Sequence, residues 1–208
     1  MAINLTKGQT INLEKSQYDL SAVTVGLGWD VRKAGGGGFL SGLFSGNAPD
    51  YDLDEIAFLL DQNDKMMNLG DKLVGSDVIF FNNLVHPSRN IWLTGDNQTG
   101  AGEGDDEQII VKLDALAPQY HKILFVVSIY QGLQKNQHFG MLDNAFIRAV
   151  DARGKEMVRF SLSGDATFNQ KRSVVFAELY RRDGGWKFRA LGNPYDTDAF
   201  VDILKNYV

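Results

Sequence analysis

The chain has 208 residues and a mass of 23.1 kDa, and its 44% of apolar and 23% of charged residues are typical of a globular protein. A chain of this length can bury a core without disulfide or metal staples. Cysteine is absent, which excludes disulfide scaffolds, thiolate zinc sites and iron–sulfur clusters. The sequence shows no signal-peptide pattern and no long apolar run, so we expect a cytoplasmic protein.

The net charge of −5 is unevenly divided along the chain. Residues 1–110 carry 7 Lys and Arg against 16 Asp and Glu, a net charge of −9, whereas residues 111–208 carry 14 against 10, a net charge of +4. The stretches 34–64 and 90–111 contain acidic residues and no basic residue. Because a nucleic-acid surface needs a basic stripe, we expect no nucleic-acid partner. Uncompensated carboxylates instead favour a hard cation.

A period of two dominates the order of predicted elements. In the segment 23–29 the odd positions are large and apolar and the even positions are small or polar, which indicates a strand with one buried face. The same pattern predicts further strands over 52–60, 105–113, 145–149, 158–162 and 186–190, and continuous apolar runs predict central strands over 78–81, 123–127 and 174–177. Many short strands separated by turn residues predict an all-β fold, an antiparallel β-sandwich.

One segment at the end of the chain has a helical pattern. Phe200, Ile203, Leu204 and Tyr207 recur at i, i+3, i+4 and i+7 after Thr197, which we interpret as the N-cap. The pattern predicts a short C-terminal helix that covers one end or face of the sandwich.

Residues 35–50 form the one compositionally biased segment. Glycines dominate it, so we interpret it as an insertion loop within a single domain that spans residues 1–208. The loop also carries four large apolar residues, Phe39, Leu40, Leu43 and Phe44. A loop that docks on a partner is therefore the alternative interpretation.

Two acidic clusters follow the strand parity. Asp105 and Glu107 share parity with the apolar residues of the predicted strand 105–113, whereas Asp106 points the other way. Asp52 and Asp54 likewise share parity with the apolar positions of the predicted strand 52–60, and we expect them on its core-facing side. Both pairs of carboxylates can close on the same end of the sandwich.

The segment 94–104 supplies further oxygen donors. Its glycines allow tight turns that direct carbonyl oxygens inward beside Asp96 and Asn97. Carboxylate, amide and carbonyl oxygens in a flexible loop are the ligands of calcium, whereas magnesium prefers few carboxylates with a phosphate. Residues 96–107 have the length of an EF-hand loop, but Ala101 stands where that loop requires glycine.

Zinc is a poor candidate for this region. The three histidines, His86, His121 and His138, are scattered without ligand spacing, and we interpret them as surface or packing residues.

Several motifs together resemble the TerD family, the tellurite-resistance and stress proteins of bacteria. In the N-terminal half they are Val25–Asp30, Tyr51–Asp54, Phe80–Leu84, Thr94–Gly100 and Gly104–Gln108. In the C-terminal half they are Ile129–Tyr130, His138–Gly140, Asn144–Arg148, Glu178–Arg181 and Trp186–Ala190. The resemblance covers nearly the whole chain, and the order of the motifs makes it specific.

The resemblance implies a calcium-binding β-sandwich similar to C2-type domains, with two Ca²⁺ ions near one end. It also implies a non-enzymatic role in resistance to tellurite and other chemical stress, exercised through protein partners of a stress-response complex. The ligands transferred by motif are Asp30, Asp52, Asp54, Asn82, Asn83, Asp96, Asn97, Asp105, Asp106 and Glu107. Both carboxylates of each pair stay candidates.

Two other classes of function are compatible with the acidic clusters. One is a metal-dependent enzyme that acts on a phosphorylated or glycosylated substrate. The other is a calcium-dependent module that contacts a membrane surface, where cations bridge carboxylates to anionic lipid and residues 39–44 insert. The absence of basic residues from 34–64 favours the protein scaffold over the membrane module.

Overall fold

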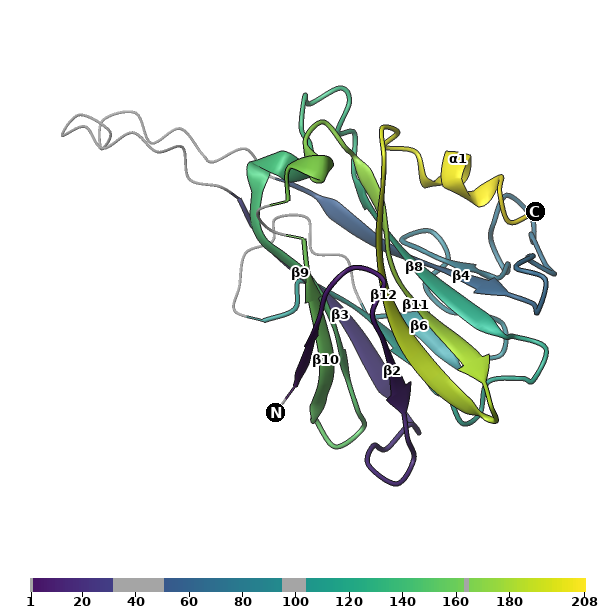
Figure 1. Cartoon of the computed structure of the whole chain (residues 1–208). Coiled ribbons are helices and arrows are strands. Elements are labelled where there is room, and N and C mark those ends of the chain that lie inside the picture. The colour runs from purple at the N-terminus through teal and green to yellow at the C-terminus, as the bar shows by residue number, and fades with distance from the viewer. Residues whose placement is uncertain (1, 32–50, 95–103, 163–164) are drawn as a thin grey trace.

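The computed structural model describes residues 2–31, 51–94, 104–162 and 165–208. In these ranges, twelve strands form two six-stranded sheets that pack face to face, and a short helix follows the last strand (Figure 1). The predicted β-sandwich is thereby confirmed. The predicted insertion loop over 35–50 lies outside the described residues.

Each sheet combines strands that are distant in the sequence. Across sheet A the order is β1 (Ile3–Leu5), β10 (Glu156–Ser161), β9 (Leu142–Val150), β3 (Val23–Val31), β7 (Glu107–Val111) and β6 (Ile91–Leu93). Across sheet B it is β2 (Thr10–Leu13), β12 (Gly185–Tyr195), β11 (Ser173–Arg182), β8 (Lys122–Ile129), β4 (Leu53–Leu60) and β5 (Val78–Ile79). Among these pairs only β1 and β10 run parallel.

The main core lies between the two sheets. Val25 and Leu27 of β3 and Ile109 of β7 face it from sheet A, and Leu53 and Leu59 of β4 face it from sheet B. All five are fully buried. Each such side chain stabilises the fold by about 1.5–3 kcal/mol relative to an exposed position. The period of two in the sequence therefore arises because alternate side chains of each strand are buried between the sheets.

The outer face of sheet B is covered by the helix α1 (Phe200–Leu204), which Figure 1 shows against β4 and β8. Ile203 and Leu204 are buried there with Phe58 and other outward-facing residues of β4. The ring centroids of Phe58 and Phe200 lie 6.3 Å apart. Strand β4 is consequently buried on both faces, and this fact decides the positions of its acidic residues.

The predicted C-terminal helix is present, but its cap differs from the prediction. Ala199 occupies the N-cap position, and the Thr197 hydroxyl oxygen accepts the Ala199 N–H at 3.0 Å. Thr197 also donates to the Asp202 carboxylate at 2.8 Å. Thr197 thus stabilises the approach to the helix from two residues before its cap.

Several strand bounds differ from the predicted ones. The predicted strand 105–113 begins at Glu107 and ends at Val111, because the chain bends before Glu107. The predicted strand 78–81 ends at Ile79, because the backbone groups of Phe80 and Asn83 bond to each other in a tight turn. Strands β1, β2 and β6 have three or four residues each and were not predicted.

Two 3-10 helices, η2 (Phe139–Met141) and η3 (Ala166–Phe168), flank the last strands. In the described part of the chain, no helix has the length and apolar character that crossing a membrane requires.

Candidate functional site

The acidic segments meet at one end of the sandwich. Strand β3 ends there, and β4 and β7 begin there, so residues 29–30, 54–55 and 105–107 are brought together from three strands. The backbone N–H of Glu55 donates a hydrogen bond to the side-chain carboxylate of Glu107 across the space between the sheets. The structure therefore places the two predicted acidic segments at the same end.

Glu55 is a member of this site that the sequence analysis missed. Only 1% of its surface is exposed, and neither carboxylate oxygen is bonded to a side chain of the described residues. Burial, and then the neighbouring Glu107 and Asp105 carboxylates, raise the pKa of Glu55 well above its ordinary value, although the backbone N–H of Ile109 acts in the opposite direction. Its shared parity with Leu53, which faces the main core, could have indicated that Glu55 points inward.

Asp54 lies on the other face of β4, and Asp52 directly precedes the strand. They share parity with Phe58, which packs under α1 and not between the sheets. Their predicted parity with buried residues holds, but the core that this face meets lies under α1 and not between the sheets. A strand covered on both faces is apolar at odd and even positions alike, so its pattern does not reveal which face meets the opposite sheet.

Asp105 also departs from the predicted geometry. Its carboxylate lies over Gly26 on the outer face of sheet A, where Arg148 binds it through Nε at 2.7 Å and Nη2 at 3.2 Å. Gln108 donates a further hydrogen bond at 3.2 Å. The prediction that Asp105 shares the inward face with Glu107 was wrong, because the bend before β7 interrupts the alternation.

The ion pair of Asp105 continues across the outer face of sheet A. Arg148 Nη1 donates to Glu156 at 2.9 Å, and Glu156 accepts Arg159 Nε at 2.9 Å. The Arg159 guanidinium stacks 4.0 Å from the ring centroid of Phe146. Hydrogen bonds from Arg159 and Arg148 lower the pKa of Glu156 despite its partial burial. This network fixes the segment that leads into β7.

Asp106 and Asp30 lie at the end of β3. The Asp106 carboxylate accepts the backbone N–H of Trp29 at 3.0 Å. Burial raises the pKa of Asp106; the Trp29 N–H opposes this shift, and the charges of Asp30 and Asp105 add to it. Asp30 is exposed and accepts the Asn144 amide at 2.8 Å.

The remaining predicted ligands fall into two groups. Asn83 is buried, and its amide bonds the backbone of its own loop, accepting from Gly75 at 3.1 Å and donating to Val78 at 2.5 Å. Asn82 is exposed at the turn. Asp96 and Asn97 lie outside the described residues. Within the described ranges, no three or more His, Asp and Glu side chains are arranged to hold a metal ion.

Two of the histidines are buried, as a packing role requires. His86 Nε2 lies 3.1 Å from an Asp77 oxygen that also accepts the Tyr120 hydroxyl at 2.9 Å. His138 Nε2 lies 3.1 Å from the Gln170 amide nitrogen, and burial lowers the pKa of His138.

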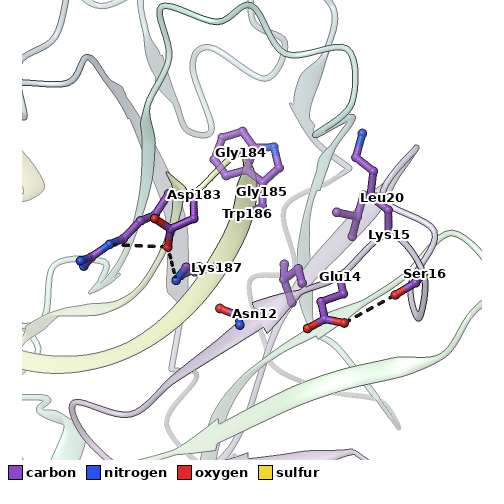
Figure 2. Close-up of a pocket in the computed structure, with 12 residues that line it drawn as sticks. Asn12, Glu14, Lys15, Ser16, Leu20, Asp183, Gly184, Gly185, Trp186 and Lys187 are labelled. Carbon is purple, nitrogen blue, oxygen red and sulfur yellow. Dashed lines mark hydrogen bonds and ion pairs between the residues drawn. The ribbon is translucent and has the colours of Figure 1, made fainter.

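A cavity of about 420 Å³ opens at the opposite end of β3. The turn Arg182–Gly185 and the loop after β2 form its walls, and the buried Trp186 contributes to its floor (Figure 2). Asp183 in the wall lies 3.0 Å from Lys187 and 3.8 Å from Arg182. The charge of Asp183 is thus compensated by two basic side chains of the same hairpin.

The comparison with protein families is consistent with this architecture and decides the family. The model of the TerD domain matches residues 1–207. The chain belongs to the TerD family. Its relatives include the tellurium resistance protein TerX of Serratia marcescens, which is 55% identical with 100% of both chains covered. The stress response protein SCP2 of Bacillus subtilis (strain 168) is 41% identical, again with 100% of both chains covered.

A solved structure supports the TerD fold. The crystal structure of a homologue of telluride resistance protein (TerD) from Streptomyces coelicolor A3(2) aligns with a TM-score of 0.60. It covers 87% of this chain and 94% of its own, at 22% identity. This likeness concerns the fold alone.

Proposed function

We propose that this TerD-family chain is a non-enzymatic calcium-binding module of a cytoplasmic tellurite-resistance and chemical-stress system, and that it acts through protein partners. The observation that carries the proposal is the convergence of carboxylates from three strands at one end of the sandwich. Glu107 is 2% exposed, and Asp106 is partly buried. Like charges at such a site repel by several kcal/mol at about 4 Å, and a divalent cation relieves that repulsion.

The donor chemistry fits calcium. Asp30, Asp106 and Glu107 supply carboxylate oxygens, which Ca²⁺ binds in numbers of about six to eight. Each of these carboxylates is a candidate ligand, and a bound ion would compensate its negative charge. The described residues alone do not form a complete ligand group, and the number of two ions rests on the family resemblance.

The proposed role in stress follows from the relatives. Proteins named for tellurium resistance and for stress response cover the whole chain at 55% and 41% identity. A role through protein partners follows from the family resemblance.

Thermal unfolding tests the cation. Calcium at 100 times its dissociation constant should stabilise the native protein by about 2.7 kcal/mol for each site, because it binds the folded form. We expect a higher melting temperature in calcium than in EGTA and a smaller response to magnesium. Equal melting temperatures in EGTA and in saturating calcium would contradict the proposal.

Cosedimentation with phosphatidylserine vesicles separates the partner role from a membrane role. We expect no calcium-dependent pelleting, because carboxylates dominate this end of the molecule and anionic lipid attracts basic segments. Robust pelleting that requires calcium and weakens with salt would support the membrane module instead.

A further inference from the structure

Glu55 and Glu107 belong to different sheets and meet between them. Glu55 lies on β4 of sheet B, and Glu107 lies on β7 of sheet A. Their exposed fractions are 1% and 2%, and the Glu55 N–H bonds the Glu107 carboxylate directly. Two carboxylates are thus enclosed at the point where the two layers of the sandwich meet.

Other deeply buried carboxylates of the described chain have basic partners, and two of them illustrate this. Glu178, which is 2% exposed, is paired with Arg189 and lies 3.5 Å from Lys122. Asp151, which is 3% exposed, is paired with Arg153 at 3.1 Å. Glu55 differs from both, because neither of its oxygens is bonded to a side chain and the charges that act on it among the described residues are those of Glu107 and Asp105.

An uncompensated buried carboxylate is strongly destabilising, and a second carboxylate beside it increases the cost. Packing does not explain Glu55, because a leucine at this position would fill the same face as Leu53 and Leu59 without that cost. A cation that contacts both carboxylates would compensate both charges at once. The donors required are oxygens, which is what the two side chains offer.

We propose that Glu55 is a calcium ligand and that Glu55 and Glu107 bind the same ion, which thereby connects sheets A and B. We call this arrangement the clamp. This inference rests on the proposed calcium function and extends it to a residue that the family motifs did not assign. Because the two ligands come from opposite layers, binding is coupled to the packing of this end of the sandwich.

Isothermal titration of calcium into wild type, Glu55→Gln and Glu178→Gln tests the inference. Gln keeps the size of Glu and removes its charge. We expect Glu55→Gln to bind roughly 10 to 100 times more weakly than wild type, since a charged ligand is lost. Glu178→Gln is the matched control, equally buried but already paired, and its calcium affinity should stay within about twofold of wild type.

The outcomes separate the two proposals. If wild type binds calcium and Glu55→Gln binds it equally well, the inference is overturned and the calcium function stands. The inference is also overturned if Glu178→Gln weakens binding as much as Glu55→Gln. If wild type binds no calcium, the proposed function fails, and the assignment of Glu55 fails with it.

Amide hydrogen exchange on the wild-type protein provides a test that does not depend on the folding of a variant. The Glu55 N–H is bonded to the carboxylate that would hold the ion. We expect calcium to slow exchange at Glu55 by about tenfold or more, because opening of this end would require release of the ion. An unchanged exchange rate at Glu55 in calcium-saturated protein would overturn the clamp.

Discussion

Arg148 binds Asp105 through two nitrogens, at 2.7 and 3.2 Å, yet the two side chains differ in exposure. The side chain of Arg148 is 26% exposed, whereas that of Asp105 is 1% exposed. Arg148 has a second partner in Glu156 and access to water, and hydrogen bonding to Asp105 raises the pKa of Arg148. Loss of the arginine therefore leaves a buried charge, and loss of the aspartate does not.

This asymmetry predicts unequal effects of the two single variants. Arg148→Gln should destabilise the protein by roughly 3 kcal/mol, because it leaves the buried Asp105 carboxylate without its charged partner. Asp105→Asn should destabilise it by roughly 1 kcal/mol, since Arg148 remains solvated and paired. Chemical unfolding of both variants measures the difference. Arg159→Gln, at the exposed end of the same network, is the control. Equal losses for Arg148→Gln and Asp105→Asn would contradict the assignment of Asp105 as the buried partner.

Gly26 makes room for the Asp105 carboxylate. A Cβ at this position would lie 2.1 Å from Asp105 Oδ2, a distance that real atoms do not adopt. Gly26→Ala should therefore destabilise the protein by about 3 kcal/mol or more, because either the carboxylate or the strand must move. Gly185→Ala is the matched control, since its nearest neighbour would be 4.0 Å away. If the two variants unfold at the same denaturant concentration, the contact is not a constraint.

The alternation of small and large residues in 23–29 predicted a strand and its buried face, and both are observed. It did not predict why the small residues are glycine. Gly26 lies under Asp105, and a Cβ at Gly28 would approach the Phe146 ring to 2.5 Å. Both neighbours are distant in the sequence, so the reason for each glycine exists only in the folded sheet.

The sequence predicted where the candidate site lies, but not which face of its strand each acidic side chain occupies. Strand parity brought the acidic segments to one end, which the Glu55 to Glu107 hydrogen bond bears out. Parity failed at Asp105, because the strand begins at Glu107. At Asp54 parity did not reveal which core the residue faces, because the helix α1 buries the outer face of β4 and makes both faces apolar. Both failures come from tertiary structure that a local pattern does not contain.

Glu55 predicts a dependence of stability on pH in the absence of calcium. Burial and the neighbouring carboxylates raise the pKa of Glu55 well above the unfolded value of about 4.5. A raised native pKa means that the folded state binds the proton more tightly, so this stabilisation is complete below about pH 4.5 and is lost as pH rises through the native pKa. The difference in unfolding free energy between wild type and Glu55→Gln should therefore become less favourable to wild type with rising pH.

Unfolding in EGTA at a series of pH values measures this difference. Asp151 and Glu156 have lowered pKa values, so their contributions to stability are lost as pH falls. These contributions are the same in wild type and Glu55→Gln, and the comparison cancels them. The contrary outcome is a difference in unfolding free energy that stays constant from about pH 4 to about pH 8, or that grows in favour of wild type. Either result would show that the charge of Glu55 is compensated in the folded protein.

Calcium affinity distinguishes a ligand from an anchor within residues 105–107. Glu107→Gln should weaken binding strongly, because it removes a charge between the sheets. Asp105→Asn should weaken binding only as far as Arg148→Gln does, and the double variant no further, because both act by releasing the start of β7 from the outer face of sheet A. Titration of wild type, Asp105→Asn, Arg148→Gln and their double variant closes the cycle, and Glu107→Gln is titrated beside them. If Asp105→Asn weakens binding as much as Glu107→Gln while Arg148→Gln leaves it unchanged, Asp105 leaves its arginine to bind the ion directly.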